Sequence, residues 1–259
     1  MLNFQEIIDN KKIEVHELKS RHKIDGATTV VRSVAQVRSI KNVLTENEFT
    51  IIPELKKSDP WRGLFRENYD VAELTKGFHK EGARAIAVQV DSKYFMGDKD
   101  HLYLASKNSD IPVLMRDFII DEAQLIDAKS HGADAVVLMP HLLSENKIKS
   151  LINFSKYIML EVIVEVNSLD ELKTALNVGA DVIGILNRDI ESQELRIKLG
   201  SELHDKIPDN VASYSVGGLK SGDDLQPLID AGFQGVLVGE KLMKAENPAR
   251  VFALLTSLM

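Results

Sequence analysis

The chain of 259 residues is 44% hydrophobic and 27% charged, which is ordinary for a soluble globular protein and long enough to bury a full core. Its formal net charge is −7 and no basic run is interleaved with aromatic residues, so the sequence does not indicate a nucleic-acid-binding protein. Because the chain has no cysteine, disulfides, thiolate metal sites and a cysteine nucleophile are excluded.

The first 48 residues precede the first strand-like segment and are predicted to form an N-terminal helical extension. Their apolar positions have the spacing of an amphipathic helix: Phe4, Ile7, Ile8, Ile13, Val15 and Leu18. The first residues lack the apolar run of a secretory signal, and no apolar stretch approaches the roughly 20 residues of a membrane helix. We therefore expect a cytoplasmic protein that does not contact a membrane.

After this extension, one local unit recurs, in which a glycine ends a helical pattern and a short apolar run follows. Its four copies lie at residues 81–88, 131–138, 178–185 and 231–238. The glycine suits the left-handed residue that closes a helix, and the continuous apolar run predicts a parallel strand buried on both faces. Four further apolar runs lie at residues 49–55, 111–115, 158–166 and 211–216. The sequence thus predicts eight strands separated by helices.

Eight similar strand–helix units are typical of a closed (β/α)8 TIM barrel. We predict a single (β/α)8 barrel domain over residues 1–259, of which 1–48 is the helical extension. A doubly wound open sheet is the alternative, which we favour less because no fingerprint glycine loop follows the first strand.

The barrel fold predicts where a functional site lies, because active sites of this fold occupy the C-terminal ends of the strands. The polar residues expected there, in strand order, are Glu54 and Lys56, Gln89 and Asp91, Arg116 and Asp117, His141, Glu165 and Asn167, Asn187 and Arg188, Ser215, and Glu240.

Several of these strand ends carry recognisable motifs. In the segment 52–60 a Glu-x-Lys pair is followed by Ser and Pro, and further motifs lie at 93–97, 111–121, 162–167, 184–190 and 236–243. In order and spacing these motifs resemble those of indole-3-glycerol phosphate synthases, from about residue 49 to the C-terminus. The resemblance implies a carboxy-lyase of tryptophan biosynthesis that needs no cofactor. Such an enzyme closes an anilino-deoxyribulose phosphate into an indole ring with loss of carbon dioxide and water.

The resemblance also implies roles for individual residues. The proton transfers fall on Glu54, Lys56 and Glu165, and Arg116 occupies the fourth catalytic position. Ring packing falls on Phe95 and Phe118, and contacts to substrate polar groups fall on Arg188 and, if a local shift of the strand end brings it in, on Asn187. Phosphate binding is expected after the last two strands, at Gly217, Gly218, Gly239 and Glu240, where backbone N–H groups can approach an anion. Tight turns are the other explanation of these glycines.

Four positions depart from the family pattern. The lysine that serves as general acid on the third strand is here Arg116, whose guanidinium stays protonated and can hold an anion but hardly deliver a proton. The asparagine on the sixth strand is replaced by Leu186, next to Asn187. A Glu-Ser-Gly on the seventh strand becomes residues 216–218, Val-Gly-Gly, and a threonine on the second strand is replaced within Gln89–Val90.

Alternatives to the family reaction stay open at this point. Glu165 could form a structural ion pair with Arg116, Lys56 or Arg188, and Glu54 could do so with Lys56. A diverged paralogue could use His141, Gln89 and Glu165 on another phosphate-bearing or aromatic molecule, since histidine titrates near neutrality. A non-catalytic, ligand-binding barrel is a third possibility.

The remaining expectations concern ligands and partners. A metal site built from His141, Glu165 and Asp91 has no supporting spacing motif, and we expect no metal. Trp61 either caps the pocket or anchors its loop. We expect a small sugar phosphate as substrate, no nucleic acid, and a monomer or weak homo-oligomer.

Overall fold

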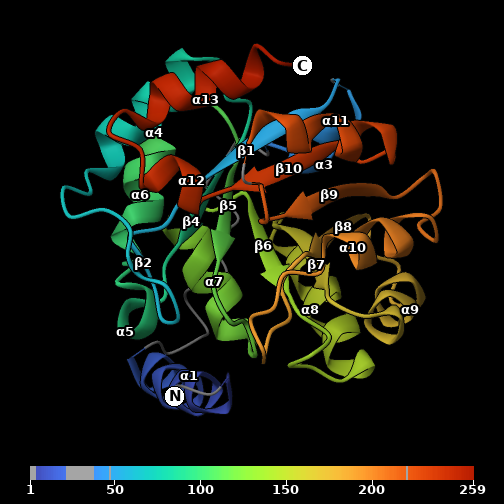
Figure 1. Ribbon diagram of the computed structural model, residues 1–259. Coiled ribbons are helices and arrows are strands. Elements are labelled where there is room, and N and C mark those ends of the chain that lie inside the picture. The colour runs from blue at the N-terminus through green and yellow to red at the C-terminus, as the bar shows by residue number, and fades with distance from the viewer. Residues whose placement is uncertain (1–3, 22–37, 47, 220) are drawn as a thin grey trace.

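The computed structural model describes residues 4–21, 38–46, 48–219 and 221–259, and eight parallel strands form a closed barrel at its centre (Figure 1). The barrel strands are β1 (Thr50–Leu55), β4 (Ile86–Gln89), β5 (Val113–Arg116), β6 (Ala135–Leu138), β7 (Glu161–Val166), β8 (Val182–Leu186), β9 (Ala212–Val216) and β10 (Gly235–Val238). They pair in the order β1-β10-β9-β8-β7-β6-β5-β4, so chain neighbours are also neighbours in the barrel. The predicted (β/α)8 barrel is confirmed, and the open-sheet alternative is wrong.

Helices lie between the strands and cover the outside of the barrel (Figure 1). They are α4 (Val71–Lys80), α5 (Ser92–Phe95), α6 (Asp100–Lys107), α7 (Glu122–Ser130), α8 (Glu145–Tyr157), α9 (Leu169–Asn177), α10 (Ile197–His204), the 3-10 helix η1 (Gly222–Asp224), α11 (Leu225–Asp230), α12 (Glu240–Met243) and α13 (Pro248–Thr256). A short antiparallel hairpin follows β1, and each of its strands, β2 (Ser58–Asp59) and β3 (Gly63–Leu64), has two residues.

The glycine-then-strand units form as expected. The glycines that follow four helices, Gly82, Gly132, Gly179 and Gly232, have φ between +72° and +93°. One predicted boundary is wrong: the fifth barrel strand, β7, begins at Glu161 rather than at Ile158. Ile158 caps the end of α8, and Met159 turns the chain with a φ of +53° before the strand starts.

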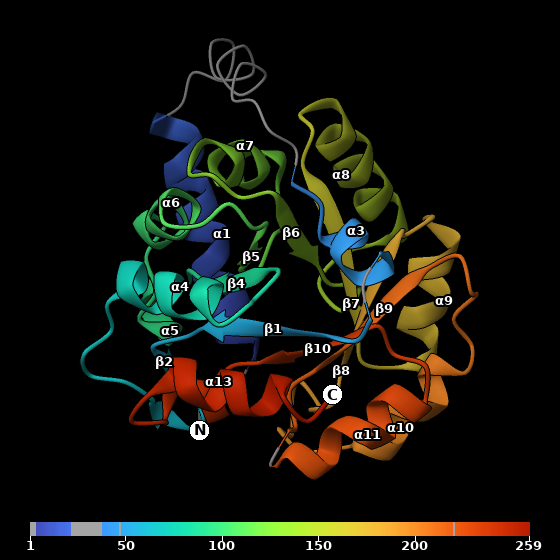
Figure 2. The same ribbon diagram turned by 90° about the horizontal axis from the view of Figure 1, so that it is seen from above.

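The N-terminal extension contains two helices in the described residues, α1 (Phe4–Arg21) and α3 (Ile40–Thr45). The rest of the predicted extension, at 1–3, 22–37 and 47, lies outside the described residues. Helix α1 packs against α7 (Figure 2). Helix α3 lies at the opposite end of the barrel, where its first backbone N–H donates to Glu161 at the start of β7.

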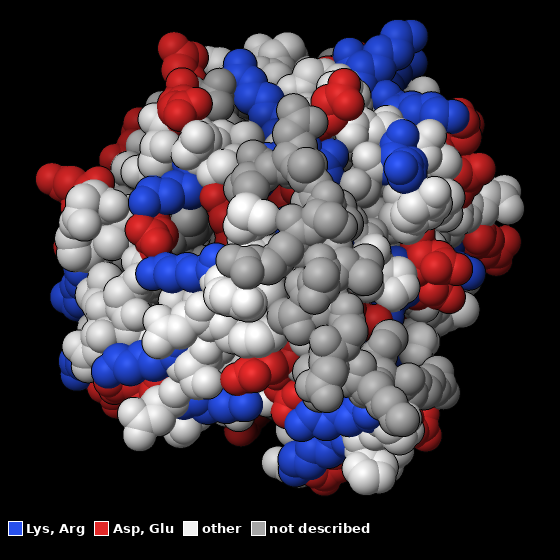
Figure 3. Space-filling model, turned by 180° about the vertical axis from the view of Figure 1, so that it is seen from behind, with Lys and Arg blue, Asp and Glu red and all other residues white. Residues whose placement is uncertain are grey.

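The core has two parts, one between the strands and the outer helices and one inside the barrel. The inner part combines small residues, such as Ala87 and Ala135, with larger ones, such as Ile52 and Leu114, and includes Tyr214, which is completely buried. On the surface seen in Figure 3, the acidic and basic side chains drawn in colour are interspersed. Among the described residues, no helix is both long enough and apolar enough to span a membrane.

Candidate active site

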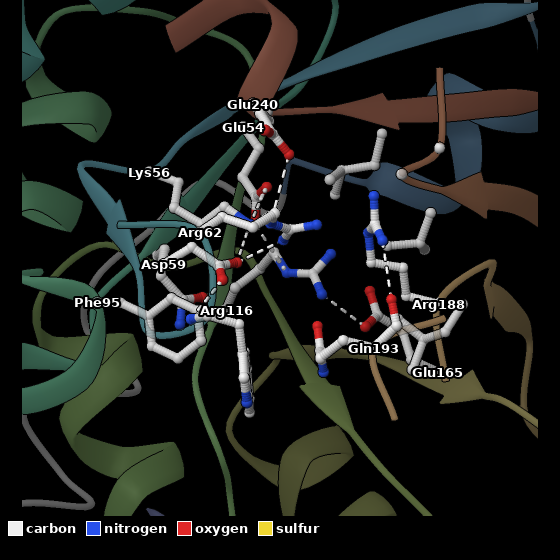
Figure 4. Close-up of a pocket in the computed structure, with 18 of the residues that line it drawn as sticks. Glu54, Lys56, Asp59, Arg62, Phe95, Arg116, Glu165, Arg188, Gln193 and Glu240 are labelled. Carbon is white, nitrogen blue, oxygen red and sulfur yellow. Dashed lines mark hydrogen bonds and ion pairs between the residues drawn. The ribbon is translucent and has the colours of Figure 1, made fainter. Parts of the chain in front are cut away.

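A cavity of about 540 Å³ opens at the C-terminal ends of the strands (Figure 4). Each of the eight barrel strands contributes to its wall, as do the loops after β1, β8 and β9 and the start of α12. The strand residues that line it include Glu54, Gln89, Arg116, Val137, Glu165, Leu186, Val216 and Leu237. The functional site is therefore where the barrel fold predicts it.

At the centre of the cavity, Arg116 bridges two carboxylates. Its Nε lies 3.2 Å from Oε1 of Glu54, and its Nη2 lies 2.8 Å from Oε2 of Glu165. Glu54 and Glu165 are buried, Glu165 has no exposed surface, and the Arg116 side chain is 14% exposed. Of the ion pairs considered for Glu165, the structure contains the one with Arg116.

The surroundings shift the pKa of both partners of this ion pair. Burial acts to lower the pKa of Arg116, but Glu165 and Glu54 outweigh it and hold that pKa above its ordinary value. Burial raises the pKa of Glu165, and Glu54 adds to this, although Arg116 and Tyr214 act in the opposite direction. Arg116 is thus a permanent cation, whereas Glu165 is a carboxyl group that can exchange a proton.

Glu165 has a second partner that the sequence did not reveal as functional. The hydroxyl of Tyr214 donates to Oε1 of Glu165 at 2.8 Å. Tyrosine is common in β-strands, so Tyr214 between the two serines of β9 is ordinary strand composition. The only signal was the strand alternation, which places Tyr214 on the same face as Val216.

Lys56 lies beside Glu54 at the rim of the same charged cluster. Its Nζ is 3.5 Å from Oε2 of Glu54 and 3.4 Å from Oδ2 of Asp59. Asp59 also accepts from the backbone N–H of Trp61 and pairs with Arg62. Burial acts to raise the pKa of Asp59, but Lys56 and Arg62 outweigh it and lower that pKa.

Asp59 and Arg62, which sequence reasoning did not single out, therefore hold Lys56 and the strand 1 loop in place. Their signal was the run of charged residues after the Glu-x-Lys pair.

One wall of the cavity is aromatic. The rings of Phe95 and Phe118 lie 6.0 Å apart, and Phe4 from α1 contacts Phe118 edge-on at 5.5 Å. Trp61 also lines the cavity. Phe95 and Phe118 thus lie where the resemblance placed them, and Phe4 is an addition from the N-terminal helix.

Helix α1 is held at this wall by a buried lysine. Nζ of Lys11 lies 3.0 Å from Oδ2 of Asp91 and 2.8 Å from Oδ1 of Asp117, and all three side chains are nearly inaccessible. Asp91 and Asp117 follow β4 and β5, so this ion-pair cluster ties the N-terminal helix to the mouth of the barrel.

The opposite side of the cavity carries the expected anion-binding elements. Gly217 and Gly218 line it with φ of +70° and +89°, values that L side chains rarely adopt. Arg188 also lines it, and its Nη1 donates to the carbonyl of Gln193 at 2.9 Å. Burial lowers the pKa of Arg188, and the like charge of Arg62 adds to this. On this side, the guanidinium groups of Arg62 and Arg188 thus face a cavity bordered by the backbone of Gly217 and Gly218.

Glu240 and Gly239 complete this side in different ways. Glu240 pairs with Lys244 at 2.7 Å and lies 3.4 Å from Arg62. A Cβ on Gly239 would overlap with Oε2 of Glu54 and lie 3.2 Å from the Glu54 Cβ. Gly239 therefore leaves room for Glu54, in addition to any part in binding phosphate.

Of the residues predicted to have a catalytic, substrate-binding or phosphate-binding role, Asn187 and His141 lie outside the cavity lining. The other strand-end residues outside it are Asp91, Asn167 and Ser215. Asn187 is buried behind the wall, where its Nδ2 donates to Oγ of Ser215 at 2.8 Å and to the carbonyl of Gly217 at 2.7 Å. Leu186 lines the cavity instead, because neighbouring residues at a strand end face opposite sides.

His141 lies outside the lining as well. The chain turns after Pro140, so His141 packs on Phe4 with ring centroids 5.2 Å apart and lies 3.6 Å from Glu171. The metal ligands considered from the sequence have separate partners, and no group of three His, Asp or Glu suited to a metal occurs in the part of the chain that the structure describes.

Comparisons with solved structures support the fold alone. An N-acetylmannosamine-6-phosphate 2-epimerase from Clostridium perfringens matches with a TM-score of 0.62 at 13% identity, over 88% of this chain and 99% of that one. Thiamine phosphate pyrophosphorylase from Pyrococcus furiosus matches with a TM-score of 0.61 at 16% identity, over 85% and 97%.

Sequence comparisons are more specific. The model of the family described as indole-3-glycerol phosphate synthase matches residues 4–254. The indole-3-glycerol phosphate synthase of Caldanaerobacter subterraneus subsp. tengcongensis is 36% identical over 246 residues, which cover 94% of each chain. That of Aquifex aeolicus is 38% identical over 212 residues, 81% of this chain and 82% of the other. The chain therefore belongs to the indole-3-glycerol phosphate synthase family.

Proposed function

We propose that the chain closes an anilino-deoxyribulose phosphate into indole-3-glycerol phosphate with loss of carbon dioxide and water, as a carboxy-lyase of tryptophan biosynthesis. The observation that carries this function is the convergence of Glu54, Lys56 and Glu165 on one cavity at the family's positions. No feature of the described residues favours the diverged or the non-catalytic alternative.

The cavity fits the two ends of such a substrate. Its volume of about 540 Å³ is ordinary for a small-molecule site. The anilino ring would pack against Phe95 and Phe118. The phosphate would lie against the backbone of Gly217–Gly218, where the charges of Arg62 and Arg188 favour an anion.

The reaction sets the proton requirements. The substrate oxygen that leaves as water must take up two protons, and one proton must leave the substrate skeleton. Because Arg116 cannot deliver a proton, we assign the general acid to Lys56, which can be reprotonated through Glu54 at 3.5 Å. Glu165, with its raised pKa, is the base that accepts the substrate proton.

Arg116 then acts by charge alone. It holds Glu54 and Glu165 in one network, and it presents a permanent positive charge to the substrate carboxylate until that group leaves as carbon dioxide. The apolar side chains of Leu186 and Val216 remove polar contacts to the sugar on the β8–β9 side of the cavity.

We further propose that the enzyme works in the cytoplasm on this sugar phosphate without a nucleic-acid partner. Its organisation as one domain and its state as a monomer or weak homo-oligomer remain predictions.

Steady-state turnover of the anilino-deoxyribulose phosphate, followed by indole fluorescence, tests the proposal. Saturable turnover by the purified protein is expected. If the wild type is inactive while Arg116→Lys gains activity, the proposal is wrong and the third strand is the position that has diverged.

A further inference from the structure

Three residues on adjacent strands form one row inside the barrel, below the cavity. In the strand register Glu165 on β7 is opposite Gly184 on β8, and Gly184 is opposite Tyr214 on β9. A Cβ on Gly184 would lie 2.8 Å from Cγ of Glu165 and 3.1 Å from the Tyr214 hydroxyl. The side chains of Glu165 and Tyr214 therefore meet across the space that glycine leaves.

Tyr214 reaches the reaction site only through Glu165. It is completely buried and does not line the cavity, and its hydroxyl donates to Oε1 of Glu165 at 2.8 Å. Arg116 holds the other oxygen, Oε2, at 2.8 Å. With both oxygens held, the carboxyl group has a fixed orientation beneath the substrate.

The hydroxyl, rather than the ring, is the informative part of Tyr214. A phenylalanine would fill the same space in the inner core, whereas a buried hydroxyl is costly unless it is hydrogen-bonded. The family pattern places a carboxylate one layer higher on this strand, where this chain has Val216. Tyr214 thus brings a polar group to the site from a strand whose expected polar residue is missing.

We propose that Tyr214 is a positioning residue for the reaction, which orients Glu165 through Oε1 and stabilises its ionised form so that it can accept the substrate proton. This inference depends on the proposed function. Among the described residues, three groups on other barrel strands act on Glu165: Arg116 on β5 and Tyr214 on β9, which favour the ionised carboxyl, and Glu54 on β1, which disfavours it.

The test is Tyr214→Phe, which keeps the ring and removes the donor. We expect kcat to fall about 10- to 100-fold, the range for one hydrogen bond to a charged group, with KM changed much less. The acid limb of the pH profile of kcat should move to higher pH, because the Glu165 carboxylate has lost a donor. Tyr103→Phe, on the exposed face of α6, is the matched control and should leave both quantities unchanged.

A second substitution guards against a folding defect in Tyr214→Phe. Site-specific 3-fluorotyrosine at position 214 makes the phenol a stronger donor, so the acid limb should move to lower pH. If neither variant moves the acid limb, Tyr214 is a packing residue and the proposal fails.

A spectroscopic titration separates this proposal from the proposed function. The carboxyl infrared band of Glu165, assigned by its loss in Glu165→Gln, should titrate at higher pH in Tyr214→Phe than in the wild type. If the band titrates at higher pH in Tyr214→Phe than in the wild type, but the wild type shows no turnover, the proposed function fails and the positioning contact stands. An unshifted band overturns the positioning role whatever the activity.

Discussion

Arg116 and Glu165 form a buried ion pair, with 2.8 Å between Nη2 and Oε2, in the lining of the barrel's cavity. The pair explains how a carboxylate without exposed surface is tolerated at the end of an apolar strand. A lysine at position 116 could supply both a positive charge and a proton. Arginine supplies the charge but not the proton, so proton donation has to come from another residue.

Removing this arginine should destabilise the protein. Arg116→Met leaves the buried Glu165 carboxylate without a cation and leaves Glu54 with Lys56 alone, and breaking a buried pair from one side typically costs about 3–5 kcal/mol. Denaturant unfolding at neutral pH measures the loss, with exposed Arg84→Met as the control. Equal midpoints for the wild type and both variants would show that the ion pair does not contribute to stability.

Lys56 should be required for the rate rather than for binding. Lys56→Arg keeps the positive charge beside Glu54 and Asp59 but replaces an amine that can donate a proton. We expect kcat to fall about 10²- to 10⁴-fold with little change in KM. Lys173→Arg on the surface of α9 controls for the substitution itself, and undiminished kcat in Lys56→Arg would rule out the acid role.

Gly239→Ala tests the space reserved for Glu54. The φ of Gly239 is −112°, which any residue can adopt, so the effect of alanine is steric: its methyl group would displace the Glu54 carboxylate. We expect kcat to fall at least 10-fold, by analogy with the loss of one positioned catalytic group.

The control for this variant is Gly77→Ala, whose methyl group would meet Ala249 at 3.2 Å on the outer helices, far from the cavity. If Gly239→Ala and Gly77→Ala lower kcat equally, tight packing and not the position of Glu54 is the cause.

Lys11 should control substrate binding through helix α1. Lys11→Met removes the cation that joins α1 to Asp91 and Asp117, so Phe4 should no longer be held against Phe118. We expect KM to rise several-fold and the unfolding free energy to fall by about 3–5 kcal/mol. Lys12→Met, next along the chain and exposed, should change neither, and a Lys11→Met variant with wild-type KM would contradict this role of α1.

The barrel could be predicted because its signals are local. Four glycines that close helices are each followed by an apolar run of strand length, and with the four further apolar runs these leave few arrangements other than a closed barrel. The positions of Glu54, Lys56, Arg116 and Glu165 could be predicted for the same reason, since each follows directly from the end of a strand.

The sequence could not predict which way some side chains point or which residues far apart in the chain come into contact. Asn187 and Leu186 differ by one residue, and only the register decides that the leucine lines the cavity while the asparagine is buried behind it. His141 follows a turn whose course is not encoded in a strand pattern. The contact of Tyr214 with Glu165 depends on Gly184, on the strand between them, because any side chain there would block it.

The most direct test of the central claim is the stoichiometry of the reaction. Purified protein is incubated with the anilino-deoxyribulose phosphate labelled in its carboxyl carbon, and released carbon dioxide and indole product are measured together. Catalysed ring closure predicts one carbon dioxide for each indole formed, with both rates falling together in Lys56→Arg. Release of carbon dioxide without indole, or neither product from the wild type, would contradict it.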